Sequence, residues 1–182
     1  MDGVFRAIRH ARESDVPLIG TCGGFQHLVI EFARNVLGLE DAGHAETDSD
    51  SPHLFITPLS CSLVGRTMNV TLHPGTRAHA CYAADGARES YYCNFGLNPA
   101  YQGDLEAAGL RISGVDADGE PRVVELPGHP FFIGTLFLPQ TRSSPNTPHP
   151  LIAAFVTAAH RTARSTNGGR RFPVAPPPAP VP

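Results

Sequence analysis

A single cysteine, Cys22, lies at a position where chains commonly present a nucleophile. It separates the apolar segment 17–20 from an amphipathic stretch that begins at Gly23. Gly20 and Gly24 allow a strand and a helix to approach closely there, so that the side chain between them projects above the sheet. At a helix N-terminus, free N–H groups and the helix dipole favour thiolate over thiol. We predict a nucleophilic Cys22; a buried structural cysteine in a tight turn is the competing interpretation.

The elements around Cys22 are predicted from apolar periodicity. Asp2 caps a first helix, residues 17–20 form a short buried strand, and a second helix follows Cys22 and ends at Gly38. The acidic segment 40–52 is interpreted as a solvated loop. The remaining pattern predicts strands at 59–64, 68–72, 79–82, 91–95, 110–114, 122–126 and 131–138, and helices at 99–109 and from Pro148 onward.

The composition is that of one globular domain with a tail. The chain has 182 residues, of which 41% are hydrophobic and 17% charged, which are ordinary values for a globular protein. Residues 1–164 are assigned to the domain. Residues 165–182 are rich in proline and offer little apolar surface to bury, so we expect a disordered tail there.

Charge and cysteine spacing exclude several classes of function. A net charge of -3 with scattered signs gives no basic stripe for nucleic acid. No apolar run approaches the ~18 residues that cross a membrane, and no signal-peptide pattern opens the chain, so we expect a cytoplasmic protein. The four cysteines form no CxxC pair. We therefore expect no metal site, no cofactor and no dense disulfide framework.

Four segments carry a resemblance to a known family: GTCGGFQ at 20–26, IEFARNVLG at 30–38, VELPGHPFF at 124–132 and RSSPNTPHPL at 142–151. They resemble the class I glutamine amidotransferase domain of CTP synthase, in register from residue 1 to about 160. The similarity is closer still to a small bacterial family described as CTP synthase C-terminal region-related (seleno)proteins, which lack the synthetase domain. The resemblance implies a flavodoxin-like α/β fold with the cysteine turn at the top of the sheet.

The chain shows no counterpart of the first strands of that domain, nor of its glycine-rich loop. We expect the strand before Cys22 to lose neighbours and to leave a sheet edge unpaired. The family's loop supplies one N–H of the oxyanion hole, and losing such a donor typically costs ~3 kcal/mol of transition-state stabilisation. The expected fold is therefore incomplete at its N-terminus, as a truncated gene product or a misplaced start codon would make it.

The resemblance also implies a catalytic histidine and glutamate, which the family takes from a Phe-His-Pro-Glu sequence. The matching segment here reads Phe-Leu-Pro-Gln, with Leu138 and Gln140 at the two catalytic positions. Glutamine hydrolysis needs a histidine that accepts the cysteine proton and an acid that orients this histidine. Only Cys22 of the family triad remains, so we expect glutaminase activity to be absent or weak.

Substrate-binding positions of the family are partly retained. The resemblance assigns substrate contacts to Gly23, Gln26 and Glu46, of which Glu46 matches the acid that holds the glutamine amino group. The arginine that clamps the glutamine carboxylate falls at Asn94, which offers at most one weaker hydrogen bond. The expected ligand is a small-molecule amide, glutamine or a derivative, with free glutamine disfavoured.

Other residues near these positions offer different chemistry. Of the histidines, His44 beside Glu46 is the remaining candidate for a substitute base, although a surface role is favoured for it; structural or outward-facing positions are expected for His27, His129 and His149. Cys93 precedes Asn94 by one residue. If Cys93 approaches Cys22, reversible disulfide or sulfenic acid chemistry becomes available without a histidine; an inert buried Cys93 is the favoured alternative.

Three interpretations of function therefore stay open. The chain is an amidotransferase-like enzyme that uses Cys22, a catalytically silent module that binds a ligand or a partner subunit, or a thiol-redox protein. CTP synthesis by this chain alone is not expected, because it has no phosphate-binding glycine-rich loop with its lysine and contains no lysine at all.

Overall fold

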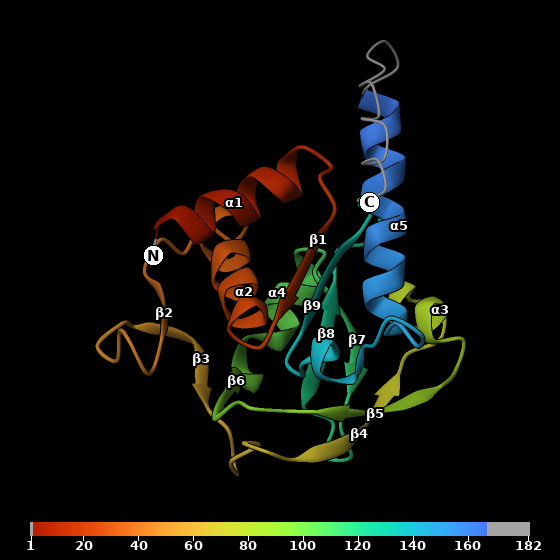
Figure 1. Cartoon of the computed structure of the whole chain (residues 1–182). Helices are drawn as coiled ribbons and strands as arrows, with labels where there is room; N and C mark the ends of the chain where they lie inside the picture. The colour runs from red at the N-terminus through yellow and green to blue at the C-terminus, as the bar shows by residue number, and fades with distance from the viewer. Residues whose placement is uncertain (1, 167–182) are drawn as a thin grey trace, which may run out of the picture.

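A computed structural model describes residues 2–166 of the chain (Figure 1). The helices are α1 (Asp2–Glu13), α2 (Gly23–Asn35), α3 (Arg77–Tyr82), α4 (Gln102–Ala107) and α5 (Pro150–Thr166), with short 3-10 turns η1 (Pro99–Tyr101) and η2 (Pro139–Arg142). The strands are β1 (Leu18–Thr21), β2 (Ala42–His44), β3 (His53–Pro58), β4 (Thr67–Leu72), β5 (Gly86–Ser90), β6 (Phe95–Leu97), β7 (Arg111–Val115), β8 (Pro121–Glu125) and β9 (Phe132–Thr135).

The strands form two sheets, and the α/β class expected from the sequence is confirmed. The larger sheet has the order β1-β9-β8-β7-β4-β5, and the smaller sheet has the order β2-β3-β6. In the larger sheet β1 runs parallel to β9, while the pairs from β9 through β5 are antiparallel. Within residues 2–166, β1 lies at the sheet edge with a strand neighbour on one side only.

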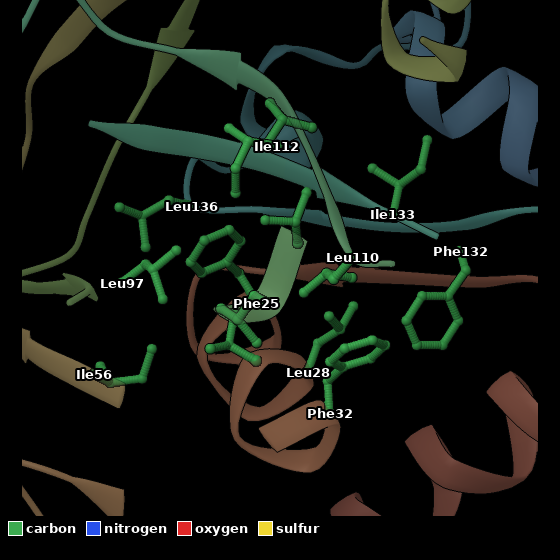
Figure 2. Packing of buried hydrophobic residues seen from close by; sticks show 14 of the residues in the cluster. Phe25, Leu28, Phe32, Ile56, Leu97, Leu110, Ile112, Phe132, Ile133 and Leu136 are labelled. Carbon is green, nitrogen blue, oxygen red and sulfur yellow. The ribbon is translucent and has the colours of Figure 1, made fainter. Parts of the chain in front are cut away.

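Helix α2 packs its apolar face into the space between the two sheets. Phe25, Leu28 and Phe32 recur at helical spacing and are almost completely buried. Figure 2 shows these three side chains among residues of β9 and of the smaller sheet, with Ile133 and Ile56 on different sides. Burial of each such side chain contributes about 1.5–3 kcal/mol, so this face anchors the helix that begins at Cys22.

A glycine contact brings β1 and α2 together. A Cβ atom on Gly20 would lie 2.7 Å from the carbonyl oxygen of Gly24, closer than real Cβ atoms approach. On the adjacent strand, a Cβ atom on Gly134 would lie 3.2 Å from a ring carbon of Phe25. The strand and the helix therefore meet closely only because these positions lack side chains, which fixes where the chain turns at Cys22.

Several sequence-based assignments are wrong, because contacts distant in sequence decide these segments. Residues 79–82 belong to α3, whose first N–H groups are capped by the side chains of Thr76 and, from far along the chain, Glu125. The acidic segment 40–52 contains the buried strand β2 and is not wholly a solvated loop.

The predicted strands at 59–64 and 91–95 are displaced. The strands are β3, which ends at Pro58, and β5 and β6, which lie on either side of residues 91–94. Segment 91–94 bonds instead to the loop 59–66, as the Leu63 N–H to Cys93 carbonyl bond shows.

The first two residues assigned to the predicted tail are helical instead. Helix α5 continues to Thr166, so residues 165 and 166 are helical, and the Ser165 hydroxyl donates to the carbonyl of Thr162, a contact between neighbouring turns of a helix. The rest of the predicted tail, residues 167–182, lies outside the described residues.

Candidate active site

Cys22 occupies the turn between β1 and α2 in an unusual backbone conformation. Its φ is 51° and its ψ is -110°, a combination that residues with a side chain rarely adopt. Two hydrogen bonds hold the turn: the Cys22 N–H donates to the Thr135 carbonyl at 2.8 Å, and its carbonyl accepts from Gln26 N–H at 3.3 Å. The side chain is half-buried at the N-terminus of a 13-residue helix.

The sulfur of Cys22 is bonded to the sulfur of Cys93. The two Cα atoms are 6.5 Å apart, and the residues are separated by 71 positions in the sequence. The Cys22 sulfur also lies 3.8 Å from the carbonyl oxygen of Tyr92, and the Cys93 sulfur lies 3.5 Å from the carbonyl oxygen of Leu136. The approach of the two cysteines that the sequence raised as an alternative is therefore present in the structure.

Leu138 is the N-cap of η2, three residues after the end of β9, and Gln140 is the second residue of η2. Leu138 is half-buried, and its N–H donates to the Ser90 carbonyl at 2.8 Å. Gln140 is exposed, and its carbonyl accepts from the N–H of Ser143. Within the described part of the chain, no hydrogen bond or ion pair joins Cys22 to a histidine or a carboxylate.

The side chain of Gln26 links α2 to the smaller sheet. Its amide nitrogen donates to the Phe95 carbonyl at 2.9 Å, and its amide oxygen lies 3.2 Å from Nε2 of His44. Nδ1 of His44 accepts from the N–H of Glu46 at 3.1 Å. The proton of the neutral imidazole is therefore on Nε2, where it bonds to Gln26. Both nitrogens of His44 are engaged, so His44 is not a free base for Cys22.

Burial shifts the acid–base behaviour of two histidines on this side of the molecule. Desolvation lowers the pKa of His44, and the nearby Glu46 carboxylate opposes the shift. Desolvation also lowers the pKa of His27, which packs edge-on against the ring of Phe5 at 5.6 Å. Both rings therefore favour the neutral form at neutral pH.

The predicted substrate-binding residues do not all meet in one cavity. Gln26 and Glu46 line a cavity of about 470 Å³, together with Asp2, Phe5, His27, Ile30, Arg34, His44, Thr47 and Asp48. Gly23 adjoins Cys22 in the first turn of α2, and Asn94 is exposed next to Cys93. Cys22, Gly23 and Asn94 are absent from the lining of that cavity.

His129 and His149 serve the packing of helices. Nε2 of His129 donates to the Ala11 carbonyl at 2.9 Å and ties α1 to the β8–β9 connection. Nε2 of His149 lies 3.0 Å from the buried carboxylate of Glu89 and 3.2 Å from the hydroxyl of Tyr82. The sequence missed this Glu89–Tyr82–His149 cluster, because the three residues come from separate elements without a shared motif.

The described residues hold no group of three or more histidine, cysteine, aspartate or glutamate side chains placed to bind a metal ion. Among the helices of residues 2–166, none is long and apolar enough to cross a membrane.

The chain is similar to known proteins over most of its length. Residues 1–158 match the family described as Glutamine amidotransferase class-I. CTP synthase of Carboxydothermus hydrogenoformans is 41% identical over 172 residues, which cover 89% of this chain and 32% of that protein. CTP synthase of Rubrobacter xylanophilus is 42% identical over 167 residues, which cover 87% of this chain and 30% of that protein. The chain spans about a third of the length of these curated relatives.

Solved structures agree with the sequence matches. The glutaminase domain of Trypanosoma brucei CTPS with bound acivicin superimposes with a TM-score of 0.84 at 29% identity, over 88% of this chain and 66% of that one. A glutamine amido transferase from Methylobacillus flagellatus, at 14% identity and a TM-score of 0.51 over 98% of this chain and 74% of that one, shares the fold. The chain therefore belongs to the class I glutamine amidotransferase family, and within it matches the glutaminase domain of CTP synthases.

Proposed function

We propose that this chain is a glutamine amidotransferase-like domain in which Cys22 is the nucleophile and glutamine hydrolysis is absent or weak. The observation that carries the proposal is the surroundings of Cys22. Its positive φ in the turn from β1 to α2 supports a role as nucleophile, and within residues 2–166 no histidine or carboxylate bonds to it. The resemblance puts Leu138 and Gln140 at the positions of the family's base and acid.

The loss of the base has a predictable kinetic cost. Leucine can neither accept the thiol proton nor protonate the departing ammonia, and a glutamine cannot stabilise an imidazolium as a carboxylate does. General acid–base catalysis typically contributes about 10²–10⁴-fold to the rate. His44 does not substitute, because one of its nitrogens accepts the Glu46 N–H and the other bonds to Gln26.

The ligand that we propose is a small-molecule amide that lacks the full recognition of free glutamine. Asn94 replaces the arginine clamp and offers no charge to a carboxylate. Glu46 is exposed at the rim of its cavity and remains able to hold an amino group, while the amide of Gln26 is already bonded on both sides.

A partner subunit is part of the proposal. The similar CTP synthases are about three times longer than the matched region, so the activity of such a protein needs regions that this chain does not match. A domain without turnover of its own can keep its fold in order to bind an acceptor synthase or a regulatory partner.

Labelling of Cys22 tests the proposal. The fully reduced protein and a Cys22→Ala control are incubated with iodoacetamide or with a diazoketone analogue of glutamine, and intact mass is measured. We expect iodoacetamide to modify Cys22, and the diazoketone to leave it unmodified, because the base and the carboxylate clamp are missing. Diazoketone labelling that disappears in Cys22→Ala would show a working glutamine site and overturn the proposal.

A second candidate function is thiol redox chemistry at the same residue. The bond between the sulfurs of Cys22 and Cys93 favours it, because a disulfide in equilibrium with two thiols needs no histidine.

A further inference from the structure

We propose that Cys22 and Cys93 form a hydroperoxide-reactive dithiol, in which Cys22 attacks the peroxide and Cys93 resolves the product as a reversible disulfide. This inference rests on the thiol-redox function proposed for Cys22, and it adds a substrate class and a separate role for each cysteine.

Two consecutive residues at the end of β9 contact the two cysteines. The Thr135 carbonyl accepts from the backbone N–H of Cys22 at 2.8 Å, and the carbonyl of the next residue, Leu136, lies 3.5 Å from the Cys93 sulfur. The Cα separation of 6.5 Å falls within the range that a disulfide spans. The pair therefore forms and opens without movement of the two backbones.

The segment that carries Cys93 is anchored independently of the disulfide. The Cys93 carbonyl accepts from Leu63 N–H at 3.0 Å, the Asn94 carbonyl accepts from Leu59 N–H at 2.9 Å, and the Tyr91 N–H donates to the Arg66 carbonyl at 2.8 Å. These bonds fix Cys93 itself, the following residue Asn94, and Tyr91 two positions before it. After reduction the Cys93 thiol consequently remains beside Cys22.

The two sulfurs differ in their surroundings, and the difference assigns the roles. Cys22 is half-buried at the N-terminus of α2, where backbone N–H groups stabilise a thiolate and an oxidant can reach the sulfur. Cys93 is only 4% exposed and is not itself at the N-terminus of a described helix, so an oxidant reaches its sulfur less readily. Cys22 is therefore the attacking thiolate, and Cys93 is the resolving thiol.

The reaction consumes one hydroperoxide and one dithiol per cycle. The Cys22 thiolate attacks the terminal oxygen of a hydroperoxide, the O–O bond breaks, and a proton from solvent releases the alcohol, or water from hydrogen peroxide, leaving a sulfenic acid on Cys22. The Cys93 thiol then attacks the Cys22 sulfur; the S–O bond breaks and water leaves with the Cys93 proton. A cellular dithiol exchanges with the disulfide, is itself oxidised, and restores both thiols.

The same step controls the nucleophile. A sulfur bonded to Cys93 has no lone thiolate with which to attack an amide or an alkylating reagent. Oxidation of the pair therefore closes the site around Cys22, and reduction opens it.

Peroxide oxidation of the reduced chain tests the inference. Reduced wild type, freed of reductant, is mixed with equimolar hydrogen peroxide and followed by intact mass and by non-reducing peptide mapping, with dimedone as the probe for sulfenic acid. Cys93→Ser, Cys22→Ser and, as a matched control at an exposed free cysteine, Cys61→Ser are treated alike. Each oxidised sample is then returned to a thioredoxin-type dithiol.

We expect wild type and Cys61→Ser to form the Cys22–Cys93 linkage and to recover both thiols with the dithiol. Cys93→Ser should accumulate dimedone adduct on Cys22, and the rate of peroxide consumption should fall at least about tenfold in Cys22→Ser, because the buried Cys93 reacts slowly. Unchanged consumption in Cys22→Ser, or no adduct on Cys22 in Cys93→Ser, would overturn the assigned roles. Absence of the linkage in oxidised wild type would overturn the pair itself.

The same reduced samples test the glutaminase proposal independently of the redox pair. Rapid ammonia release from glutamine by the reduced protein contradicts absent or weak turnover and leaves the redox pair untouched, whereas failure to form the disulfide leaves the glutaminase proposal untouched.

Discussion

At the scale of single residues, Cys22 has a strained backbone, and no histidine or carboxylate among residues 2–166 bonds to it. A positive φ on a residue with a side chain costs of order 1–3 kcal/mol and persists where the surrounding structure enforces it. Here the enforcing contacts are the N–H bond to Thr135 and the close packing of Gly20 on α2. Leu138 and Gln140 occupy the positions at which the family has its base and its acid. The hydrogen bonds described for these two residues involve only their backbone atoms.

The strain at Cys22 can be measured by comparing two substitutions that both remove the disulfide. Cys22→Gly should unfold with a free energy about 1 kcal/mol higher than Cys22→Ala, because glycine adopts φ 51° without a steric penalty. Urea denaturation of both variants under reducing conditions gives the difference. Equal stabilities would mean that the turn is unstrained.

His44 makes stability depend on pH. Its pKa in the folded state is lowered from 6.5, mainly by burial, so the unfolded chain binds more protons below that value. Well above pH 6.5 His44 is neutral in both states and has no effect on stability. As the pH falls below this value, protonation of His44 in the unfolded chain increasingly destabilises the fold. His44→Asn removes the titration, while the Asn oxygen can still accept the N–H of Glu46 as an Asx turn.

We expect the unfolding free energy to fall less between pH 7 and pH 5 in His44→Asn than in wild type. Chemical denaturation at the two pH values measures this difference. A drop of the same size in both proteins would show that His44 does not carry the dependence; His27, whose pKa is lowered in the same direction, is present in both.

At the scale of elements, the sequence predicted those helices and strands whose apolar periodicity and end residues lie within the segment itself. The helices on either side of the Cys22 turn, the strand between them and the last helix follow apolar periodicity, and Gly38 with φ 75° ends the second helix region. The failures fall where a distant residue decides. Helix α3 depends on the Glu125 carboxylate, which accepts from the N–H groups of Arg77 and Ala78 across 48 and 47 positions. No local window contains that contact.

The contact between β1 and α2 yields a matched pair of substitutions. Gly20→Ala should destabilise the fold by about 1–3 kcal/mol, because its Cβ would lie 2.7 Å from the Gly24 carbonyl oxygen and force the elements apart. Gly24→Ala meets no atom within 4 Å and lies in the first helical turn, so it should be neutral or slightly stabilising. Thermal unfolding of both variants tests this. The reverse order of stabilities would contradict the close packing at the turn.

At the scale of the whole molecule, the sequence predicted a nucleophilic role for Cys22 but not the surroundings of this residue. It pointed to Cys22 and raised Cys93 as a neighbour, since both flank positions with family counterparts. It did not predict the hydrogen bond between Gln26 and His44, because the segment that forms β2 was interpreted as a loop. It also did not predict the cavity that Gln26 and Glu46 line together with residues of α1. These depend on how the smaller sheet packs against α2, which is visible only in three dimensions (Figure 1).

The Cys22–Cys93 bond connects two distant parts of the chain and should stabilise the whole fold. It closes a loop across 71 positions, for which the chain-entropy model gives about 4 kcal/mol. We expect the oxidised protein to melt about 10 °C above the reduced protein, with Cys93→Ser insensitive to reductant. Calorimetry of the two redox forms measures the shift. Identical melting temperatures would show that the bond does not restrict the unfolded chain.

Glutamine hydrolysis is the measurement that tests the central claim most directly. The fully reduced chain and Cys22→Ala are incubated with glutamine, and ammonia is followed with a coupled dehydrogenase assay. A Cys22 without a base predicts that ammonia release by wild type is indistinguishable from that of Cys22→Ala. Rapid, repeated ammonia release that depends on Cys22 would contradict the account, because it would require a proton acceptor that the described surroundings of Cys22 do not contain.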